Sequence, residues 1–319
     1  MAKDRKIGVI DMGTNTFHLL IASVKEEKFQ LLYREKVSVR LGKGGISHGK
    51  IMPDAWERAL HALEHFREVL DRYEIPEVYA TATSAIRNAD NGKDLAKAIE
   101  ERTKIPVRII NGQEEAELIY FGVKKAMDLG TNTSLIMDIG GGSVEFILCN
   151  RGHIFWMHSF EVGAQRLLDK YHQGDPILAS EMADMEVFLD EQLALLLAAV
   201  KEHEPDTFVG SSGTFDTLSD IYLQETGKTK QDGATEYPLP IEEYHRIHAE
   251  LITKNRPERL KIPGMMEMRV DMIVVASCLI DWALKRIPSL KNLRVSAYAL
   301  KEGILHSVVN SVQDNLHHS

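Results

Sequence analysis

Two segments, far apart in the chain, combine an aspartate with a turn of glycine and small polar residues. They are Asp11-Met12-Gly13-Thr14-Asn15-Thr16 and Asp138-Ile139-Gly140-Gly141-Gly142-Ser143. A turn of this composition points several backbone N–H groups into one concavity, and glycine lets an anion come close to the backbone. Threonine and serine hydroxyls supply further donors for phosphate oxygens. We therefore expect phosphate to be bound by Gly13, Thr14, Asn15, Thr16, Gly140, Gly141, Gly142 and Ser143.

The aspartate at the start of each turn is suited to a divalent cation. Mg²⁺ favours carboxylate ligands together with oxygens of its substrate. Asp11 and Asp138 are therefore candidate ligands, directly or through water. One such turn alone is typical of an ordinary hairpin loop. Two in matching register favour a phosphate-handling enzyme that uses Mg²⁺, with Mn²⁺ as the alternative metal.

A cluster of carboxylates lies between the two turns, at Glu114, Glu115 and Glu117. It opens a predicted helix that follows directly after a predicted strand. Acidic side chains in this place complement the helix dipole. A carboxylate held beside bound phosphate can instead orient a water molecule and accept its proton. The residues alone leave both interpretations open.

Two further features have the composition of anion sites. Arg87 follows the predicted strand 78–81, where α/β proteins place ligand-binding residues, and its guanidinium can bind phosphate or stay solvated. Gly213 and Thr214 belong to a third glycine turn, before a predicted helix whose N-terminus attracts anions. His18, inside the first hairpin, is expected to be packed or hydrogen-bonded rather than catalytic.

The elements that position these residues alternate along the chain. Apolar strands flank each glycine turn, and further strands alternate with helices of regular apolar spacing, which predicts an α/β architecture. Two similar hairpins predict two related half-molecules that face one cleft. Beyond the hairpins we expect strands at 29–39, 78–81, 107–110, 207–210 and 293–295, helices at 95–102, 113–127, 176–203 and 270–286, helices beginning at 53 and about 300, and an exposed loop at 227–240.

Composition sets limits on the partners. The chain has 319 residues, enough for two medium-sized domains. Its formal net charge is -9, so nonspecific binding of a nucleic acid polymer is not expected. The same negative charge repels any long polyanion, and such a substrate therefore needs a locally basic groove.

The cellular location is predicted from the cysteines and the apolar segments. Cys149 and Cys278 fall in a predicted strand and a predicted helix, which suits a reducing compartment. The first strand begins almost at the N-terminus, and the longest apolar stretch, 272–284, is too short to span a membrane. We expect a cytoplasmic protein without a signal peptide or membrane contact. The apolar stretch suits either a core helix or the surface of a homodimer.

Taken together, these residues resemble the exopolyphosphatase and guanosine pentaphosphate phosphohydrolase family, within the actin, hexokinase and heat-shock-chaperone superfamily. The resemblance spans nearly the whole chain. Sugar kinases and actins share the two glycine turns but lack the Glu-Glu-Ala segment between them. The most specific segments are 11–18, 40–42, 82–87, 112–116 and 138–145.

The resemblance implies an α/β protein of two ribonuclease-H-like domains around a central cleft. The domains are expected at 1–127 and 128–299, with a helix at about 300–319 returning to the first. Terminal phosphates of polyphosphate or guanosine pentaphosphate are the implied substrates. The family's catalytic glutamate maps to Glu115, and its metal-associated acidic positions map to Asp138 and Glu145, with Asp11 on the first phosphate loop.

The chain matches the short, two-domain form of that family, with two departures from the family pattern. Thr14 and Thr16 stand where serine is commoner, which keeps the hydroxyls. Lys301 stands where arginine is expected, which keeps the charge but loses the guanidinium fork. Two alternatives remain beside the phosphohydrolase: an ATP-dependent kinase of the same superfamily, and a non-enzymatic sensor that binds guanosine penta- or tetraphosphate. The acidic surface and the missing extra domains favour the sensor, whereas the intact acidic positions favour the enzyme.

Overall fold

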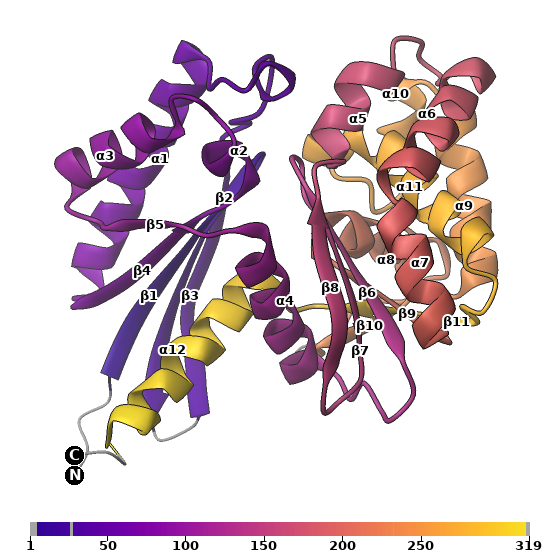
Figure 1. The fold of residues 1–319 in the computed structure, drawn as a ribbon. Coiled ribbons are helices and arrows are strands. Elements are labelled where there is room, and N and C mark those ends of the chain that lie inside the picture. The colour runs from indigo at the N-terminus through magenta and orange to yellow at the C-terminus, as the bar shows by residue number, and fades with distance from the viewer. Residues whose placement is uncertain (1–4, 26–27, 232, 317–319) are drawn as a thin grey trace. The chain divides into compact units, whose positions relative to one another are not determined.

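The computed structural model describes residues 5–25, 28–231 and 233–316, and the chain divides into two compact α/β units (Figure 1). Unit 1 comprises Met1–Gly122 together with Leu300–Ser319, and unit 2 comprises Val123–Ala299. The division falls inside helix α4 (Gly112–Ala126), whereas the sequence analysis placed it after residue 127. The turn residues at 128–133 mark the end of helix α4. The division between the units lies earlier, after Gly122.

The sheet of unit 1 has the strand order β3-β2-β1-β4-β5. Its first three strands are antiparallel, and β1, β4 and β5 are parallel. The glycine turn 13–15 connects the first two strands as predicted. The strands are β1 (Arg5–Met12), β2 (Thr16–Lys25), β3 (Lys28–Ser38), β4 (Glu77–Ala82) and β5 (Val107–Ile109).

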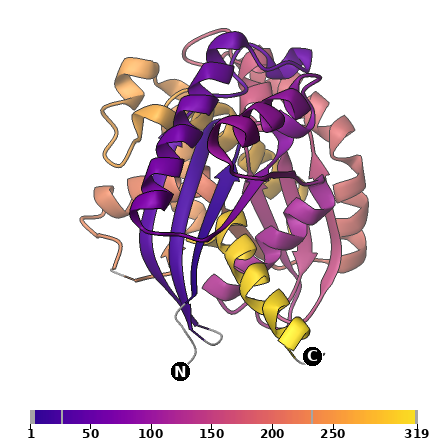
Figure 2. The ribbon, with the colours of Figure 1, turned by 90° about the vertical axis from the view of Figure 1, so that its left-hand side faces the viewer.

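The helices of unit 1 lie on both faces of this sheet, α1 and α3 on one and α4 and α12 on the other (Figures 1 and 2). Helix α1 begins with Pro53 at its first turn, where proline is tolerated, and buries the apolar positions that its spacing predicted. Helix α12 packs so closely on α4 that a Cβ added at Gly303 would overlap the carbonyl of Leu118. Besides α4, these helices are α1 (Pro53–Arg72), α2 (Ser84–Arg87), α3 (Gly92–Thr103) and α12 (Leu300–Leu316), with a 3₁₀ turn η1 (Ile46–His48).

The sheet of unit 2 repeats the topology of unit 1. Its order is β10-β11-β9-β6-β7-β8, so β8-β7-β6-β9-β11 corresponds to β3-β2-β1-β4-β5. The antiparallel hairpin and the parallel neighbours are also the same. The predicted pair of related halves is therefore present in the backbone. The strands are β6 (Ser134–Ile139), β7 (Val144–Cys149), β8 (Ile154–Phe160), β9 (Thr207–Ser211), β10 (Glu236–Pro238) and β11 (Asn292–Ser296).

Helix α11 (Met272–Arg286) forms the centre of the core of unit 2. Every residue from Ile273 to Ala283 is buried, so this apolar helix is core and not an exposed surface. The helices around it are α5 (Ala164–Tyr171), α6 (Ala179–Gln192), α7 (Ala194–His203), α8 (Ser212–Glu225), α9 (Ile241–Thr253) and α10 (Arg256–Arg259), with a 3₁₀ turn η2 (Glu267–Arg269).

Two predictions in unit 2 are wrong in detail. The predicted helix 176–203 is two helices, because the backbone leaves the helical conformation at Leu193. The buried positions keep helical spacing across this break, so spacing alone does not reveal it. The predicted loop 227–240 contains β10, which pairs with β11 at the edge of the sheet.

The cysteines are free and buried in the described structure. Burial raises the pKa of both thiols to about 12, so Cys149 and Cys278 stay protonated and unreactive at neutral pH. Within residues 5–25, 28–231 and 233–316, every helix is too short or too polar to cross a bilayer.

Candidate functional site

The two glycine turns are built alike. In the first, the Gly13 N–H donates to the carbonyl of Thr16 at 3.2 Å; in the second, the Gly140 N–H donates to the carbonyl of Ser143 at 3.0 Å. Asp11 pairs with His18 across the first hairpin, and at the equivalent register Asp138 pairs with Glu145 across the second. The matching register that the sequence predicted is therefore real, and His18 occupies the position that Glu145 occupies in the other half.

The first turn is braced by the segment that follows β3. The carbonyl of Asn15 accepts from the N–H groups of Val39 at 3.0 Å and Arg40 at 2.9 Å, and the carbonyl of Thr14 accepts from Gly42 at 3.0 Å. A Cβ added at Gly42 would lie 2.5 Å from Thr14 Cγ2, so only glycine fits there. The brace ties up carbonyl oxygens that would otherwise repel a phosphate.

The side chains of this turn are buried but keep donors. Thr14, Asn15 and Thr16 are buried, and Thr16 Oγ1 has no hydrogen-bond partner in the described part of the chain. Burying a hydroxyl without a partner costs free energy. A ligand oxygen that accepts from Thr16 would recover that cost, which agrees with a phosphate-binding turn.

The second turn is braced by the first residues of α5. The helix N-terminus has backbone N–H groups without partners inside the helix, and these donate to the carbonyls of the glycine turn. Sequence reasoning missed this segment, because nothing in residues 163–166 marks a site. The bonds run from Gly163 N to Gly142 O (3.2 Å), Ala164 N to Gly140 O (2.9 Å), Gln165 N to Gly141 O (2.9 Å) and Arg166 Nε to Gly142 O (2.9 Å).

Gly163→Ala is expected to destabilise unit 2. The added Cβ would overlap the backbone carbons of Gly141 and Gly142, which cannot rotate away as a side chain would. Overpacking of this kind costs about 1–3 kcal/mol, so the melting temperature should fall by several degrees. The control is Gly152→Ala, whose Cβ would meet only Asn150 Oδ1 at 3.6 Å. Equal melting curves for the two variants would show that the brace tolerates a side chain.

Two buried carboxylates lie opposite each other in the hairpin that carries the second turn. Asp138 on β6 is the cross-strand partner of Glu145 on β7, and both are buried. Glu145 Oε1 accepts a hydrogen bond from Ser159 Oγ at 2.7 Å on the next strand. Like charges directly opposite in a sheet destabilise it, so a cation at this pair would remove a cost. The residues therefore fit the predicted divalent metal.

Few protein ligands are available for such a metal. In the described ranges no group of three or more histidine, cysteine, aspartate or glutamate side chains is arranged to hold an ion. Mg²⁺ commonly uses one or two carboxylates and completes its shell with water and substrate phosphates. Asp138 and Glu145 match that pattern. Asp11, in unit 1, faces a histidine instead of a second carboxylate across its own hairpin.

Arg269 is a residue of this region that sequence reasoning missed. It ends η2, and its guanidinium lies directly against Gly213 of the third glycine turn. Burial lowers the pKa of Arg269, and the nearby carboxylates of Asp216 and Asp138 act against that change. The protein thus places a cation of its own near Asp138. No local pattern around Arg269 signals this, because the chain brings residues 138, 213 and 269 together only by folding.

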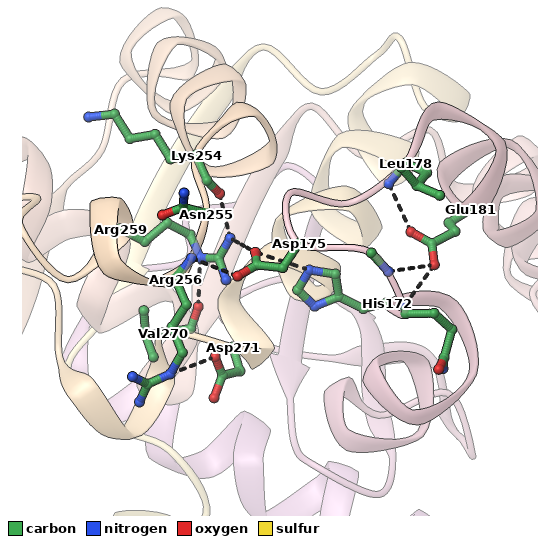
Figure 3. Close-up of polar contacts among 12 residues, drawn as sticks. His172, Asp175, Leu178, Glu181, Lys254, Asn255, Arg256, Arg259, Val270 and Asp271 are labelled. Carbon is green, nitrogen blue, oxygen red and sulfur yellow. Dashed lines mark hydrogen bonds and ion pairs between the residues drawn. The ribbon is translucent and has the colours of Figure 1, made fainter.

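The segment that carries Arg269 is fixed by a buried arginine (Figure 3). Arg259 is fully buried, and it donates from Nη1 to Asp175 Oδ1 at 2.7 Å and from Nε to the carbonyl of Val270 at 3.0 Å. A buried charge is tolerated only when paired in this way. Burial and the charge of Arg259 lower the pKa of His172 beside it, which keeps that imidazole neutral. The network therefore holds the start of α11, and with it Arg269, in one place.

Of the three carboxylates at the start of α4, the structure distinguishes one. Glu115 is buried, and its Oε2 accepts from Arg87 Nη1 at 2.7 Å. The same Arg87 nitrogen donates to the carbonyl of Ile110 at 3.2 Å. Glu114 instead pairs with Arg108 near the surface, and Glu117 is exposed. Arg87 therefore orients Glu115, and its contact with phosphate stays a prediction.

The third glycine turn lies beside the second in the sheet of unit 2. Ser211 at the end of β9 is in register with Asp138 on β6. Ser212, which starts α8, has a φ of 76°, a left-handed conformation that is strained for a residue with a side chain. Thr214 is buried, and Gly213 contacts Arg269. Strain of this kind gathers at ligand sites.

The predicted residues gather at the carboxyl ends of the parallel strands in each unit. In α/β sheets this is the edge where ligands bind. In unit 1 they are Asp11, Gly13, Thr14, Asn15, Thr16, Arg87 and Glu115, and in unit 2 they are Asp138, Gly140, Gly141, Gly142, Ser143, Glu145, Gly213 and Thr214. Lys301, the second departure noted above, forms an ion pair with Glu302 at 3.2 Å.

Comparisons with known proteins agree with this geometry. A family model described as the Ppx/GppA phosphatase family matches residues 20–312. An exopolyphosphatase from Cytophaga hutchinsonii is 43% identical, with 96% of this chain and 98% of that chain covered and a TM-score of 0.93. An exopolyphosphatase-like protein is 22% identical, with 98% and 99% covered and a TM-score of 0.88. A Ppx/GppA family member from Aquifex aeolicus is 22% identical, with 96% and 98% covered and a TM-score of 0.78. These matches confirm the predicted fold class, an α/β protein of two ribonuclease-H-like domains.

Proposed function

Because this chain belongs to the Ppx/GppA phosphatase family, we propose that it hydrolyses the terminal phosphoanhydride bonds of inorganic polyphosphate. The reaction releases orthophosphate and depends on Mg²⁺. Guanosine pentaphosphate ends in the same kind of bond, so the proposal includes it as a second substrate. Hydrolysis of either substrate requires a positioned water, a general base and groups that stabilise the negative charge of the phosphates.

The ion pair between the buried Glu115 and the partly buried Arg87 is the observation that carries this proposal. A general base must be ionised and must be held in a fixed direction. Arg87 provides both conditions, because its guanidinium favours the carboxylate form and fixes one of its oxygens at 2.7 Å. In the proposed reaction the Glu115 carboxylate orients the attacking water and accepts its proton.

Backbone amides of the two glycine turns bind the phosphates in this proposal. The carbonyls of both turns are held by neighbouring N–H groups, so the turns present donors rather than acceptors to an anion. Asp138 and Glu145 would hold Mg²⁺, and Asp11 of the first turn remains a candidate metal-associated carboxylate. When bound, the ion neutralises charge that develops on the transferred phosphoryl group.

Phosphate release is the direct test. The purified protein is incubated with long-chain polyphosphate, tripolyphosphate and guanosine pentaphosphate, with and without Mg²⁺. Release of orthophosphate from polyphosphate that stops when the metal is chelated is the expected result. Folded protein that releases no phosphate but binds guanosine pentaphosphate would support the sensor instead. ATP-dependent phosphorylation of an acceptor without release would support the kinase.

A further inference from the structure

Unit 1 has a basic hollow next to the first phosphate turn. The hollow has a volume of about 390 Å³ and is lined by Ser38, Arg40, Lys43, Asp54 and Arg58. That volume is within the range of small-ligand sites. Three of the five lining residues are cationic and one is anionic, on a chain whose net charge is -9. A local excess of positive charge on an acidic protein favours an anionic ligand.

The charges of the hollow are not equally engaged. Arg58 donates to Asp54 at 2.6 Å and to the carbonyl of Val39 at 2.7 Å, so this arginine has a structural role. Arg40 and Lys43 are exposed, and in the part of the chain that the structure describes neither forms an ion pair. Their two charges therefore remain available to a ligand.

Arg40 links the hollow to the first phosphate turn. Its N–H donates to the carbonyl of Asn15 at 2.9 Å, while its side chain lines the hollow. Its own carbonyl accepts from Lys43 N at 3.2 Å and from Arg58 Nη2 at 3.2 Å. One residue thus braces the turn with its backbone and supplies charge to the hollow with its side chain.

The backbone of Arg40 is strained. Its φ is 50°, in the left-handed region that glycine and asparagine adopt most easily. A residue with a long side chain in that region costs about 1 kcal/mol or more, and such costs persist at functional sites. The strained position of Arg40 therefore motivates the hypothesis that its guanidinium has a functional role.

We propose that the hollow formed by Ser38, Arg40, Lys43, Asp54 and Arg58 binds phosphates of a long polyphosphate chain beyond those held by the first glycine turn. This inference rests on the proposed function and adds chain-length preference to it. A polyanionic substrate needs a locally basic groove on this acidic protein. The proposal assigns that groove to the five residues of the hollow. On this proposal the hollow takes the phosphates that follow those at the turn, so long chains benefit from Arg40 and Lys43 and a substrate of three phosphates does not.

The test removes both free charges without disturbing the loop. Arg40→Asn keeps a residue that tolerates the left-handed conformation, and Lys43→Gln keeps a polar, exposed side chain. The contact of one exposed charge with a phosphate contributes only severalfold to binding. Removing two such charges should therefore raise KM for long-chain polyphosphate about tenfold. For Lys43→Gln, whose side chain lies outside the turn, kcat and KM for tripolyphosphate should stay unchanged. The salt dependence of KM should also weaken for the long chain.

The control is Lys93→Gln, which removes an exposed charge from α3 of the same unit. Lys43→Gln alone guards against misfolding of the double variant and should raise KM for the long chain severalfold. An equal change for long and short substrates, or no change, overturns the inference while the proposed function stands. If the wild type releases no phosphate, calorimetric binding of long-chain polyphosphate decides: unchanged affinity in the double variant overturns the inference too.

Discussion

Glu115→Gln is expected to lower kcat for phosphate release by about 10²–10⁴-fold, the range typical of a lost general base. Glutamine preserves the size of the side chain and can still accept from Arg87, so the packing around this buried position survives. It cannot accept a proton from water at neutral pH. The loss should therefore fall on kcat, whereas KM changes little. Steady-state kinetics on polyphosphate, with a thermal melt to confirm folding, checks this result.

Glu114→Gln is the matched control for this variant. It removes the same charge one residue earlier on the same helix, where the carboxylate pairs with Arg108 near the surface. Its kcat should remain within about twofold of the wild type, because surface ion pairs contribute little. Loss of activity in Glu114→Gln, or near-normal kcat in Glu115→Gln, would show that the base has been assigned to the wrong residue.

Asp138→Asn is expected to abolish the response of the protein to Mg²⁺. A ligand that binds only the folded state stabilises it by about 2.7 kcal/mol at a concentration of 100 Kd. For a unit of this size, a stabilisation of that magnitude raises the melting temperature by roughly 5–10 °C. The wild type should show the rise when Mg²⁺ is added, and the variant should not. Most phosphate release should be lost as well, because the phosphoryl charge is no longer neutralised.

Glu145→Gln should behave in the same way, because the two carboxylates face each other on β6 and β7. The control is Asp184→Asn, an exposed residue of α6 in the same unit. A Mg²⁺-dependent rise in melting temperature that persists in Asp138→Asn and Glu145→Gln, as it should in Asp184→Asn, would place the ion elsewhere. The thermal measurement does not depend on turnover, so it tests the metal site even in a variant without activity.

Local pattern was sufficient for most of the secondary structure. Strands such as β1 and β6 are continuous apolar runs that end in Asp and glycine, and these signals lie within a few consecutive residues. Helix α1 begins at its proline and keeps its apolar spacing throughout. The errors came where the signal is not local. The break at Leu193 keeps helical spacing on both sides. Strand β10 forms only because β11 offers an edge to pair with, and the paired residues Glu236 and Ser296 are 60 positions apart in the sequence.

The sequence by itself determined the two glycine turns, their aspartates and the helix that begins with three glutamates, because each is a set of neighbouring residue types with a fixed chemistry. Tertiary structure decided which glutamate is buried against an arginine, since Arg87 and Glu115 meet only when β4 and β5 pair. It also decided what braces each turn and which cations remain free. Arg40, Gly163 and Arg269 belong to segments without a motif, and their roles depend on which distant backbone they contact. Contacts of that kind come from the packing of the sheet, and no spacing along the chain records them.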